Sequence, residues 1–432
     1  MNVLFIGDYR PARNYGSIAT SEAMVNLIKF VIGTEHNLKI IDHRSFYNET
    51  PREGYPEYVM KLADNGTTIK KKLKILVPDF IWEYKNKIFK IDESKIHVPH
   101  TFGMYEDFYN EMLYGRKFVY ERQALEWADV VIFSGEGTIV NGIDKYGKYL
   151  VGALYQLFML WLSKIKFNRP TIIVNHTVDP GNNKEAIEMI MNIYPKLDFV
   201  GVRELASLEY LRNMGIKNGE FIPDALFTYL PKNSDWVPTD ELNAQIDFTK
   251  PYICIGDTSG IIKNRYYAGV KWDVVEIYSK MILELKKVIP QIIFVDGFRG
   301  RNQEINRLIK KNGIGYVNLL NCSYHDLFYV LKFAEIFISG RWHNSILSVL
   351  ANTPILLMGA DSYKTKSLYD ILEYNAPFFE VDTIPIYIDD IIDSTKNMLL
   401  NKKTIKSKLE IRVAHLREMA KNNISYLNQI IN

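Results

Sequence analysis

The sequence has little cysteine and no strong excess of either charge. Only two cysteines, Cys254 and Cys322, occur among the 432 residues, which excludes a disulfide framework and favours a reducing compartment. The 53 basic and 50 acidic residues leave a net charge of +3. No zinc-finger spacing and no basic stripe with interleaved aromatic residues is present. The composition therefore argues against a nucleic-acid partner.

Long hydrophobic runs are also missing. The longest apolar stretch, about Tyr149–Leu162, is interrupted by Gly152 and Gln156, and it is shorter than the ~20 residues that a membrane span needs. We expect a buried helix there. The chain opens directly on Asn2–Gly7, which has the pattern of a strand, so we expect no signal peptide and a cytoplasmic protein.

The spacings that mark metal sites and common hydrolases do not occur. His97, His100, His176 and His325 make no metal-ligand spacing. No HExxH, GxSxG or P-loop pattern is present. We therefore expect neither a metal site nor another cofactor.

Short runs rich in Ile, Val and Phe recur along the chain, with helical stretches such as Trp272–Val288 between them. Their lack of polar alternation is typical of parallel strands buried on both faces. The expected strands are Val3–Gly7, Leu38–Asp42, Val130–Ser134, Thr171–Asn175, Phe199–Arg203, Tyr252–Ile255, Ile292–Asp296, Ile336–Ser339 and Ile355–Met358. The pattern predicts an α/β protein with two Rossmann-like, doubly wound domains that face a cleft.

Residues that break both periodicities gather near positions 230–250, among them Pro231 and Pro238. We place the N-terminal domain at 1–235, the C-terminal domain at 245–404, and a final helix at 405–432 that crosses back to the first domain. Residues 44–125 form an insertion that the strand pattern does not explain. Within it, Lys70–Lys90 carries seven lysines against two acidic residues. This segment is either a peripheral contact with an anionic membrane surface or a solvated face or lid.

Polar clusters follow four of the expected strands, at the edge where open α/β sheets bind ligands. In the first cluster, Asp8 follows a strand, and Asn14 and Tyr15 come shortly before Ser17, the expected N-cap of a helix that runs to Gly33. A loop that feeds a helix N-terminus offers backbone N–H groups to an anion or to sugar hydroxyls. An ordinary strand–helix connection is the competing interpretation.

The second and third clusters each carry one charged residue of interest. Glu136 lies between Gly135 and Gly137, where it could accept hydrogen bonds from hydroxyls or simply be a solvated turn residue. Arg203 ends a strand, and its planar guanidinium suits a carboxylate or a phosphate. A structural ion pair of Arg203 with Glu204 or Asp224 is the alternative.

The fourth cluster is the most informative. Arg341 and His343 follow a strand and stand at the start of a helix, and Lys364 comes from the loop after the next strand. Together they make a basic pocket with one group that transfers protons near neutral pH. A structural histidine at a helix start is the alternative.

The order and spacing of these motifs resemble the polysaccharide pyruvyl transferase family. The resemblance rests on GD…NYGS, the glycine-containing turn, VRE…S…G…PD and SGRWHNSI…P…K, over about residues 1–40 and 125–370. Family members have a two-Rossmann architecture similar to GT-B glycosyltransferases. They transfer the enolpyruvyl unit of phosphoenolpyruvate to a sugar as a cyclic ketal, during assembly of cell-surface polysaccharides.

The resemblance implies roles for individual residues. The phosphoenolpyruvate-binding residues would be Arg203, Arg341 and Lys364, and the acid/base would be His343. The acceptor, a nucleotide- or lipid-linked saccharide, would lie against Asp8, Asn14, Tyr15, Glu136 and Asp224. The turn that holds Glu136 departs from the more purely glycine form of the family, which leaves the identity of the acceptor open.

Two other functions fit the same architecture. In a GT-B glycosyltransferase, the basic pocket would hold the diphosphate of a sugar nucleotide, and Glu136 or another carboxylate of the first domain would be the base. The bound anion separates the two enzymes: phosphoenolpyruvate or a nucleoside diphosphate. A degenerate member that only binds a glycan is disfavoured, because all four cationic and titratable positions are present.

Overall fold

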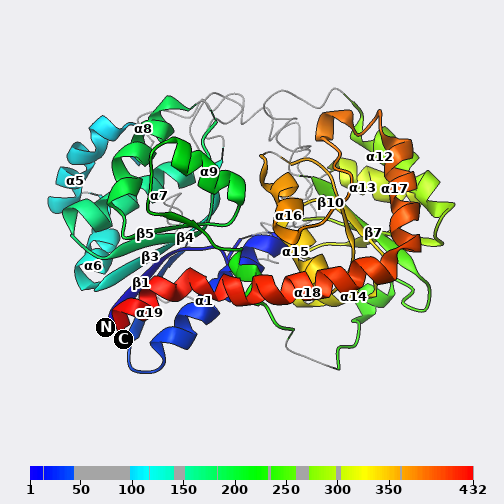
Figure 1. Ribbon diagram of the computed structural model, residues 1–432, viewed down its shortest axis with the longest axis horizontal. Coiled ribbons are helices and arrows are strands. Elements are labelled where there is room, and N and C mark those ends of the chain that lie inside the picture. The colour runs from blue at the N-terminus through cyan, green and yellow to red at the C-terminus, as the bar shows by residue number, and fades with distance from the viewer. Residues whose placement is uncertain are drawn as a thin grey trace, which may run out of the picture.

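The computed structural model describes residues 1–12, 14–42, 98–115, 117–140, 151–181, 183–231, 235–258, 272–297, 303–360 and 362–431. These residues form two parallel sheets, one in each half of the chain, with helices on both faces (Figure 1). The predicted α/β fold of GT-B type is confirmed. The lysine-rich segment 70–90 lies outside the described residues.

The first sheet has six strands in the order β2-β1-β3-β4-β5-β6. Their bounds are β1 Asn2–Asp8, β2 Asn37–Asp42, β3 Val130–Val140, β4 Thr171–Asp179, β5 Phe199–Val202 and β6 Gly219–Phe221. The strand order reverses between β1 and β3. Their carboxyl ends therefore form the topological switch point at which such sheets bind ligands.

The second sheet has five strands in the order β11-β10-β7-β8-β9. Their bounds are β7 Tyr252–Thr258, β8 Gln291–Val295, β9 Gly315–Val317, β10 Phe337–Gly340 and β11 Ile355–Leu357. Here the order reverses between β7 and β10. All nine expected strands are present, and the two missed ones, β6 and β9, have three residues each and lie at sheet edges.

Helices cover both faces of the first sheet. Consecutive residues of β1 alternate between the faces: Val3 and Phe5 pack with one cluster, whereas Leu4 and Ile6 pack with the other. On one face lie α5 Tyr105–Leu113, α6 Val119–Trp127, α7 Val151–Trp161, α8 Lys184–Ile193 and α9 Leu205–Asn213. On the other lie α1 Tyr15–Ile32 and α19 Ser425–Ile431. The strands read as continuous apolar runs because both faces are buried.

The second sheet is built in the same way. On one face lie α12 Val274–Lys286, α13 Gln303–Asn312 and α17 Ile388–Leu400. On the other lie α14 Tyr324–Phe333, α15 Trp342–Leu350, α16 Lys364–Leu372 and α18 Lys402–Ala420. The short helix α10 Asp240–Asn243 precedes this sheet.

The two halves share a hydrophobic core. Tyr15 and Ala19 of α1 and Leu226 of the 3-10 segment Ala225–Thr228 belong to the same buried cluster as α14 and α15. Helix α18 runs along both halves, and α19 returns to the first, so the two chain ends lie close together (Figure 1). Ile424 and Leu427 belong to the same buried cluster as residues of β1 and β3, so the end of the chain packs on the first sheet.

The structure corrects the expected start of the first helix and shows what the described part of the expected insertion contains. The N-cap of α1 is Asn14, not Ser17, because the Asn14 side chain accepts a hydrogen bond from the Ser17 backbone N–H at 2.8 Å. Gly33 does end the helix, with φ 58°. The buried helix expected near Tyr149–Leu162 is α7. The described part of the insertion contains α5 and α6, which pack on the first sheet.

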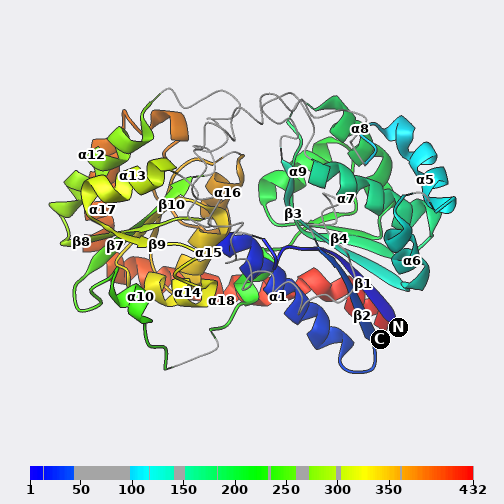
Figure 2. The same cartoon turned by 180° about the vertical axis from the view of Figure 1, so that it is seen from behind.

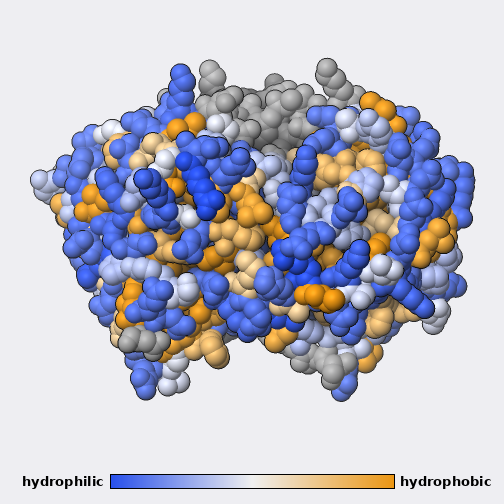
Figure 3. Space-filling view, in the orientation of Figure 1, coloured by the Kyte–Doolittle hydropathy of each residue, from blue (hydrophilic) through white to orange (hydrophobic). Residues whose placement is uncertain are grey.

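The visible surface is mixed in character. The face in Figure 3 is hydrophilic over most of both halves, with apolar side chains gathered in smaller areas. Among the described residues, none of the helices has the length and apolar character needed to span a bilayer.

Candidate functional site

The switch points of the two sheets meet at the junction of the halves. Figure 2 shows α1, which follows β1, beside α15, which follows β10. The contact between them is close: a Cβ atom at Gly16 would lie 2.3 Å from Cβ of His343. Only glycine allows the imidazole to lie against the backbone of α1. Residues that are more than 300 positions apart are therefore brought into contact.

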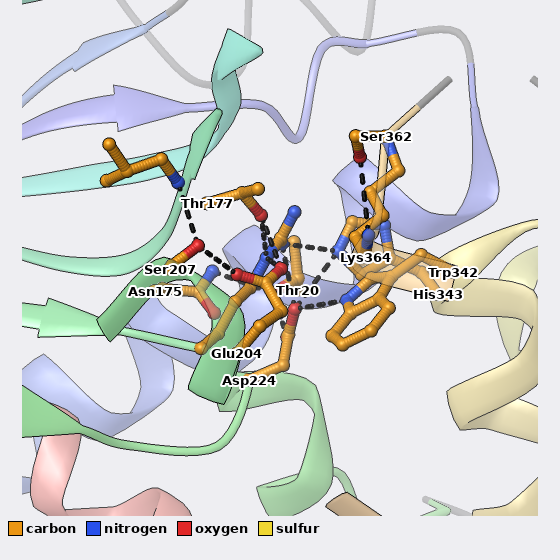
Figure 4. A network of polar contacts seen from close by, with 12 residues as sticks. Thr20, Asn175, Thr177, Glu204, Ser207, Asp224, Trp342, His343, Ser362 and Lys364 are labelled. Atoms are coloured by element: carbon orange, nitrogen blue, oxygen red, sulfur yellow. Dashed lines mark hydrogen bonds and ion pairs between the residues drawn. The ribbon is translucent and has the colours of Figure 1, made fainter. Parts of the chain in front are cut away.

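Arg203 lies at the centre of this junction. Its side chain is 2% exposed, and its Nη1 is 2.9 Å from Oδ2 of Asp224. Its Nε donates to Oε1 of Glu204 at 3.2 Å and to Oγ1 of Thr177 at 2.9 Å. The structural ion pair that the sequence left open is thus present, with both carboxylates at once. Figure 4 shows this network between the two halves.

The charges around Arg203 shift the pKa values of both acidic partners. Burial acts to raise the pKa of Asp224, but His343 and Arg203 outweigh it and hold that pKa well below its usual range. For Glu204 burial dominates and raises the pKa, although Arg203 and two hydroxyl groups oppose it. Asp224 is therefore the firmly ionised partner of Arg203.

His343 is bound from the opposite half of the molecule. Its Nε2 lies 3.2 Å from Oδ2 of Asp224 and 3.1 Å from Nη1 of Arg203. An unprotonated Nε2 accepts from Arg203, and a protonated Nε2 donates to Asp224, so either state of the imidazole has a partner. The ring is thereby oriented for proton transfer. Trp342 adds a second link across the junction, since its Nε1 donates to Asp224 at 2.9 Å.

Arg341 lies at the switch point of the second sheet. Its Nε donates to Oδ1 of Asp257 at 2.8 Å, and its Nη2 donates to the other carboxylate oxygen. Gly297 makes room for the guanidinium, because a Cβ there would lie 2.8 Å from Nε of Arg341. The side chain keeps 13% of its surface exposed. Unlike Arg203, Arg341 therefore reaches the solvent side of the junction.

Lys364 does not belong to a loop, as the sequence suggested, but is the first residue of α16. Figure 4 shows it on the same side of the network as His343. The preceding residue, Tyr363, bridges the halves: its hydroxyl hydrogen-bonds with Oγ of Ser207 at 3.0 Å and with the carbonyl of Val178. The cation is thus anchored next to a contact between the halves.

Glu136 lies on β3 beside these groups. It is 6% exposed and has φ 42°, a left-handed conformation that is rare for a residue other than glycine. Its Oε2 accepts from Oγ of Ser17 at 3.2 Å. Burial raises the pKa of Glu136, and the nearby His343 and Arg203 only partly oppose this. Glu136 therefore joins the cluster that contains His343.

Three of the residues expected to bind the acceptor, Asp8, Tyr15 and Asp224, are fully buried. Asp8 is fully buried and pairs with Arg10, whose Nη2 is 2.8 Å from Oδ2. Tyr15 is also fully buried, within the core shared by the halves. Asp224 has no exposed surface because Thr20, Arg203, Trp342, His343 and the Leu226 N–H surround its carboxylate. Of the other two, Asn14 is partly exposed and caps α1, and Glu136 is 6% exposed.

Sequence reasoning missed Thr177, Ser207, Asp257, Trp342 and Tyr363 as parts of the network. Trp342 lies inside the noted motif between Arg341 and His343, and Asp257 comes two residues after the expected strand Tyr252–Ile255. These two carried a usable signal. Ser207 also lies inside a noted motif. Thr177 meets Arg203 because β4 pairs with β5 within the first half, and Tyr363 joins the network only because the halves pack together. Within the described ranges, no group of three or more His, Cys, Asp or Glu residues could hold a metal ion.

His176, next to this network on β4, gives a test of the electrostatics. Burial and then Arg203 lower its pKa to about 3 from an ordinary 6.5. As the pH falls below about 6.5, the unfolded chain binds a proton that the folded one does not. At pH 5 this difference in proton binding at His176 lowers the free energy of unfolding by about 2 kcal/mol. We expect His176→Gln to lose less stability than the wild type between pH 7.5 and 5, measured by urea unfolding.

The control for this experiment is His415→Gln, because His415 is exposed on α18. It is expected to show the full loss of the wild type. An equal loss in the wild type and in His176→Gln would contradict the prediction. Because the comparison is between variants, the titration of the other groups cancels to first order.

The fold has known counterparts. It is similar to UDP-GlcNAc 2-epimerase from Neisseria meningitidis bound to UDP-GlcNAc, with a TM-score of 0.56 and 12% identity over 99% of this chain and 100% of that one. It is also similar to a spinosyn rhamnosyltransferase complexed with spinosyn aglycone, with a TM-score of 0.52 and 12% identity over 100% of both chains. The N-terminal domain of Candida albicans trehalose-6-phosphate phosphatase gives a TM-score of 0.54 and 12% identity, over 100% of this chain and 96% of that one. Identities this low establish the fold alone.

Sequence comparison gives a narrower answer. No curated protein matches the chain. A family model, described as polysaccharide pyruvyl transferase, matches residues 14–362. The matched range includes α1, β3, Arg203, Asp224, and the Arg341 and His343 pair, which are the elements that meet at the junction. The chain belongs to the polysaccharide pyruvyl transferase family.

Proposed function

We propose that this protein transfers the pyruvyl group of phosphoenolpyruvate onto a sugar of a cell-surface polysaccharide precursor, as a ketal. The observation that carries the proposal is the convergence of cations from both halves at the paired switch points. Arg203 comes from the first half, and Arg341, Lys364 and His343 come from the second. Family membership supports the same reaction class.

The charges of the cluster suit this donor. Phosphoenolpyruvate carries a carboxylate and a phosphate, and Arg203, Arg341 and Lys364 provide three permanent cations. Two aspartates, Asp224 and Asp257, pair with the arginines. Arg341 and Lys364 would contact the donor, while the more deeply buried Arg203 holds Asp224 and lies 3.1 Å from Nε2 of His343.

The reaction needs three events at the donor. A proton adds to the methylene carbon C3, which makes C2 electrophilic. A sugar hydroxyl attacks C2, and the phosphate leaves. A second hydroxyl of the same sugar then closes the ketal. The imidazole of His343 can accept and return a proton, and the carboxylate of Asp224, 3.2 Å from its Nε2, stabilises the protonated ring. The acceptor, a nucleotide- or lipid-linked saccharide, would approach from β3, near Asn14 and Glu136.

Thermal stabilisation by phosphoenolpyruvate tests the donor. A ligand that binds only the folded state stabilises it by about 2.7 kcal/mol at 100 times its Kd. We expect this shift with the wild type and its loss in Arg341→Ala. The matched control is Arg307→Ala, because Arg307 is exposed on α13 and should leave the shift unchanged.

A panel of nucleoside diphosphates and sugar nucleotides belongs in the same experiment. Two of the proteins with a similar fold are a rhamnosyltransferase and an epimerase, and the epimerase structure is described as bound to UDP-GlcNAc. A shift with a nucleotide and none with phosphoenolpyruvate would overturn the pyruvyl-transfer proposal. It would favour a GT-B-type glycosyltransferase of polysaccharide biosynthesis in its place.

A further inference from the structure

Glu136 has a backbone conformation that is unusual for a residue other than glycine. It stands on β3 opposite His176 of β4, immediately before the register between these strands becomes irregular. The preceding Gly135 is required by close packing, because a Cβ there would lie 2.0 Å from Nδ1 of His176. Glu136 itself adopts φ 42°. Such strain in a residue other than glycine persists where the surroundings impose it, and it is concentrated at functional sites.

The carboxyl group of Glu136 is turned towards the junction. Its Oε2 is bound by Ser17, and the residue before Ser17 is Gly16, whose backbone touches the ring of His343. The charged groups that act on it are His343, Arg203 and Asp224. Its Oε1 is buried and has no hydrogen-bond partner in the described part of the chain. A buried, unpartnered carboxyl oxygen is costly unless it is protonated or meets a ligand.

We propose that Glu136 is a catalytic acid that gives its proton to the methylene carbon of phosphoenolpyruvate, while His343 is the base for the first acceptor hydroxyl. This inference rests on the proposed function and assigns its two proton transfers to different residues. Glu136 lies on the first sheet, on the side where the acceptor would approach. His343 has Asp224 at 3.2 Å, which stabilises the imidazolium once a proton has been accepted.

The transfers balance over one turnover. The O–H bond of Glu136 breaks as a C–H bond forms at C3, and the first hydroxyl loses its proton to His343 as its oxygen bonds to C2. The C2–O bond to phosphate then breaks with its electron pair, and the phosphate takes the proton from His343. The second hydroxyl attacks C2 and passes its proton to the Glu136 carboxylate. Both residues return to their starting states.

The environment of Glu136 fits an acid rather than a base. Burial raises the pKa of this carboxyl group, which favours the protonated form before the donor binds. The groups that face it are Ser17 from α1, Arg203 from the end of β5, Asp224, and His343 from α15, with His176 on the neighbouring strand. The cations among them limit the rise, which keeps the proton transferable.

The test compares Glu136→Gln and Glu136→Asp with Glu188→Gln, a control on the exposed side of α8. Each gene replaces the native copy in the host strain, and the pyruvate ketal content of its surface polysaccharide is measured. The purified variants are tested for thermal stabilisation by phosphoenolpyruvate. We expect Glu136→Gln to lower ketal formation about 100-fold or more while keeping the stabilisation by phosphoenolpyruvate. Glu136→Asp should recover part of the activity, and Glu188→Gln should behave as the wild type.

The outcomes separate this inference from the proposed function. If Glu136→Gln leaves the ketal content unchanged, Glu136 is not the acid. If it also abolishes stabilisation by phosphoenolpyruvate, the role lies in binding or folding, and the acid assignment is again wrong. If the wild type neither makes the ketal nor responds to phosphoenolpyruvate, the proposed function itself fails, and this is seen before any variant is compared.

Discussion

Replacing Arg203 with methionine is expected to lower the free energy of unfolding by about 3–5 kcal/mol. The guanidinium is 2% exposed and pairs with two buried carboxylates, Asp224 and Glu204. Methionine fills similar space but leaves the ionised Asp224 with less compensation in a region that water does not reach. Removing one partner of a buried ion pair costs more than the pair itself contributes. Urea unfolding at neutral pH measures the change.

The pH dependence gives this prediction a second readout. Because Asp224 has a lowered pKa in the fold, its contribution to stability is present above the ordinary carboxyl pKa and is lost as the pH falls. The difference between the wild type and Arg203→Met should therefore shrink in acid. Arg212→Met is the matched control, since Arg212 is exposed in the last turn of α9, and it should change stability by less than about 0.5 kcal/mol. A similarly small change in Arg203→Met would mean that these buried ion pairs contribute little to the stability of the fold.

Replacing Gly16 with alanine is expected to reduce pyruvyl transfer about 100-fold. The new Cβ would lie 2.3 to 2.6 Å from Cβ, Nδ1 and Cγ of His343. These atoms belong to the first turn of α15, which cannot move aside as the end of a flexible side chain can. Either the ring turns away from Asp224 or the two halves separate, and a displacement of about 1 Å at a reacting group costs this much activity.

Stability distinguishes a displaced site from a lost fold. Gly16→Ala should cost only about 1–3 kcal/mol, the usual effect of overpacking, so the protein stays folded and its activity can be measured. Gly103→Ala is the control, because the nearest atom to a Cβ at Gly103 is 4.0 Å away, and it should keep full activity. Full activity in Gly16→Ala would show that the observed contact between α1 and His343 is not needed for transfer.

Much of the fold follows from local sequence pattern. A strand buried on both faces is largely apolar, so β1, β4 and β8 are visible from their runs of Ile, Val and Phe. The edge strands β6 and β9 have three residues each and bury few of them, so they leave no such run. The same reasoning predicted where function lies, because the carboxyl ends of parallel strands share one edge of a sheet.

The roles of single residues were less predictable. Asp224 has the sequence context of a loop carboxylate, and an acceptor-binding role was a reasonable expectation. In the fold it is completely buried and binds His343 and Trp342, 119 and 118 positions away. No local pattern encodes such a pairing, because it exists only when the two sheets pack against each other. Tyr15 is similar: it follows a cap residue but fills the core between the halves.

The sequence by itself determined the two parallel sheets, their strand positions, the family and the edge at which the cationic residues gather, because each depends on hydrophobic pattern and on short motifs. Only the tertiary structure decided which of those residues touch. In the folded protein, Arg203 and Asp224 form a buried ion pair, and the ring of His343 lies against the backbone of Gly16. The fold also places the unpartnered oxygen of Glu136 beside them. The physical reason is that burial and charge pairing depend on segments far apart in the sequence, and the contact of His343 with Gly16 also needs a surface from each half.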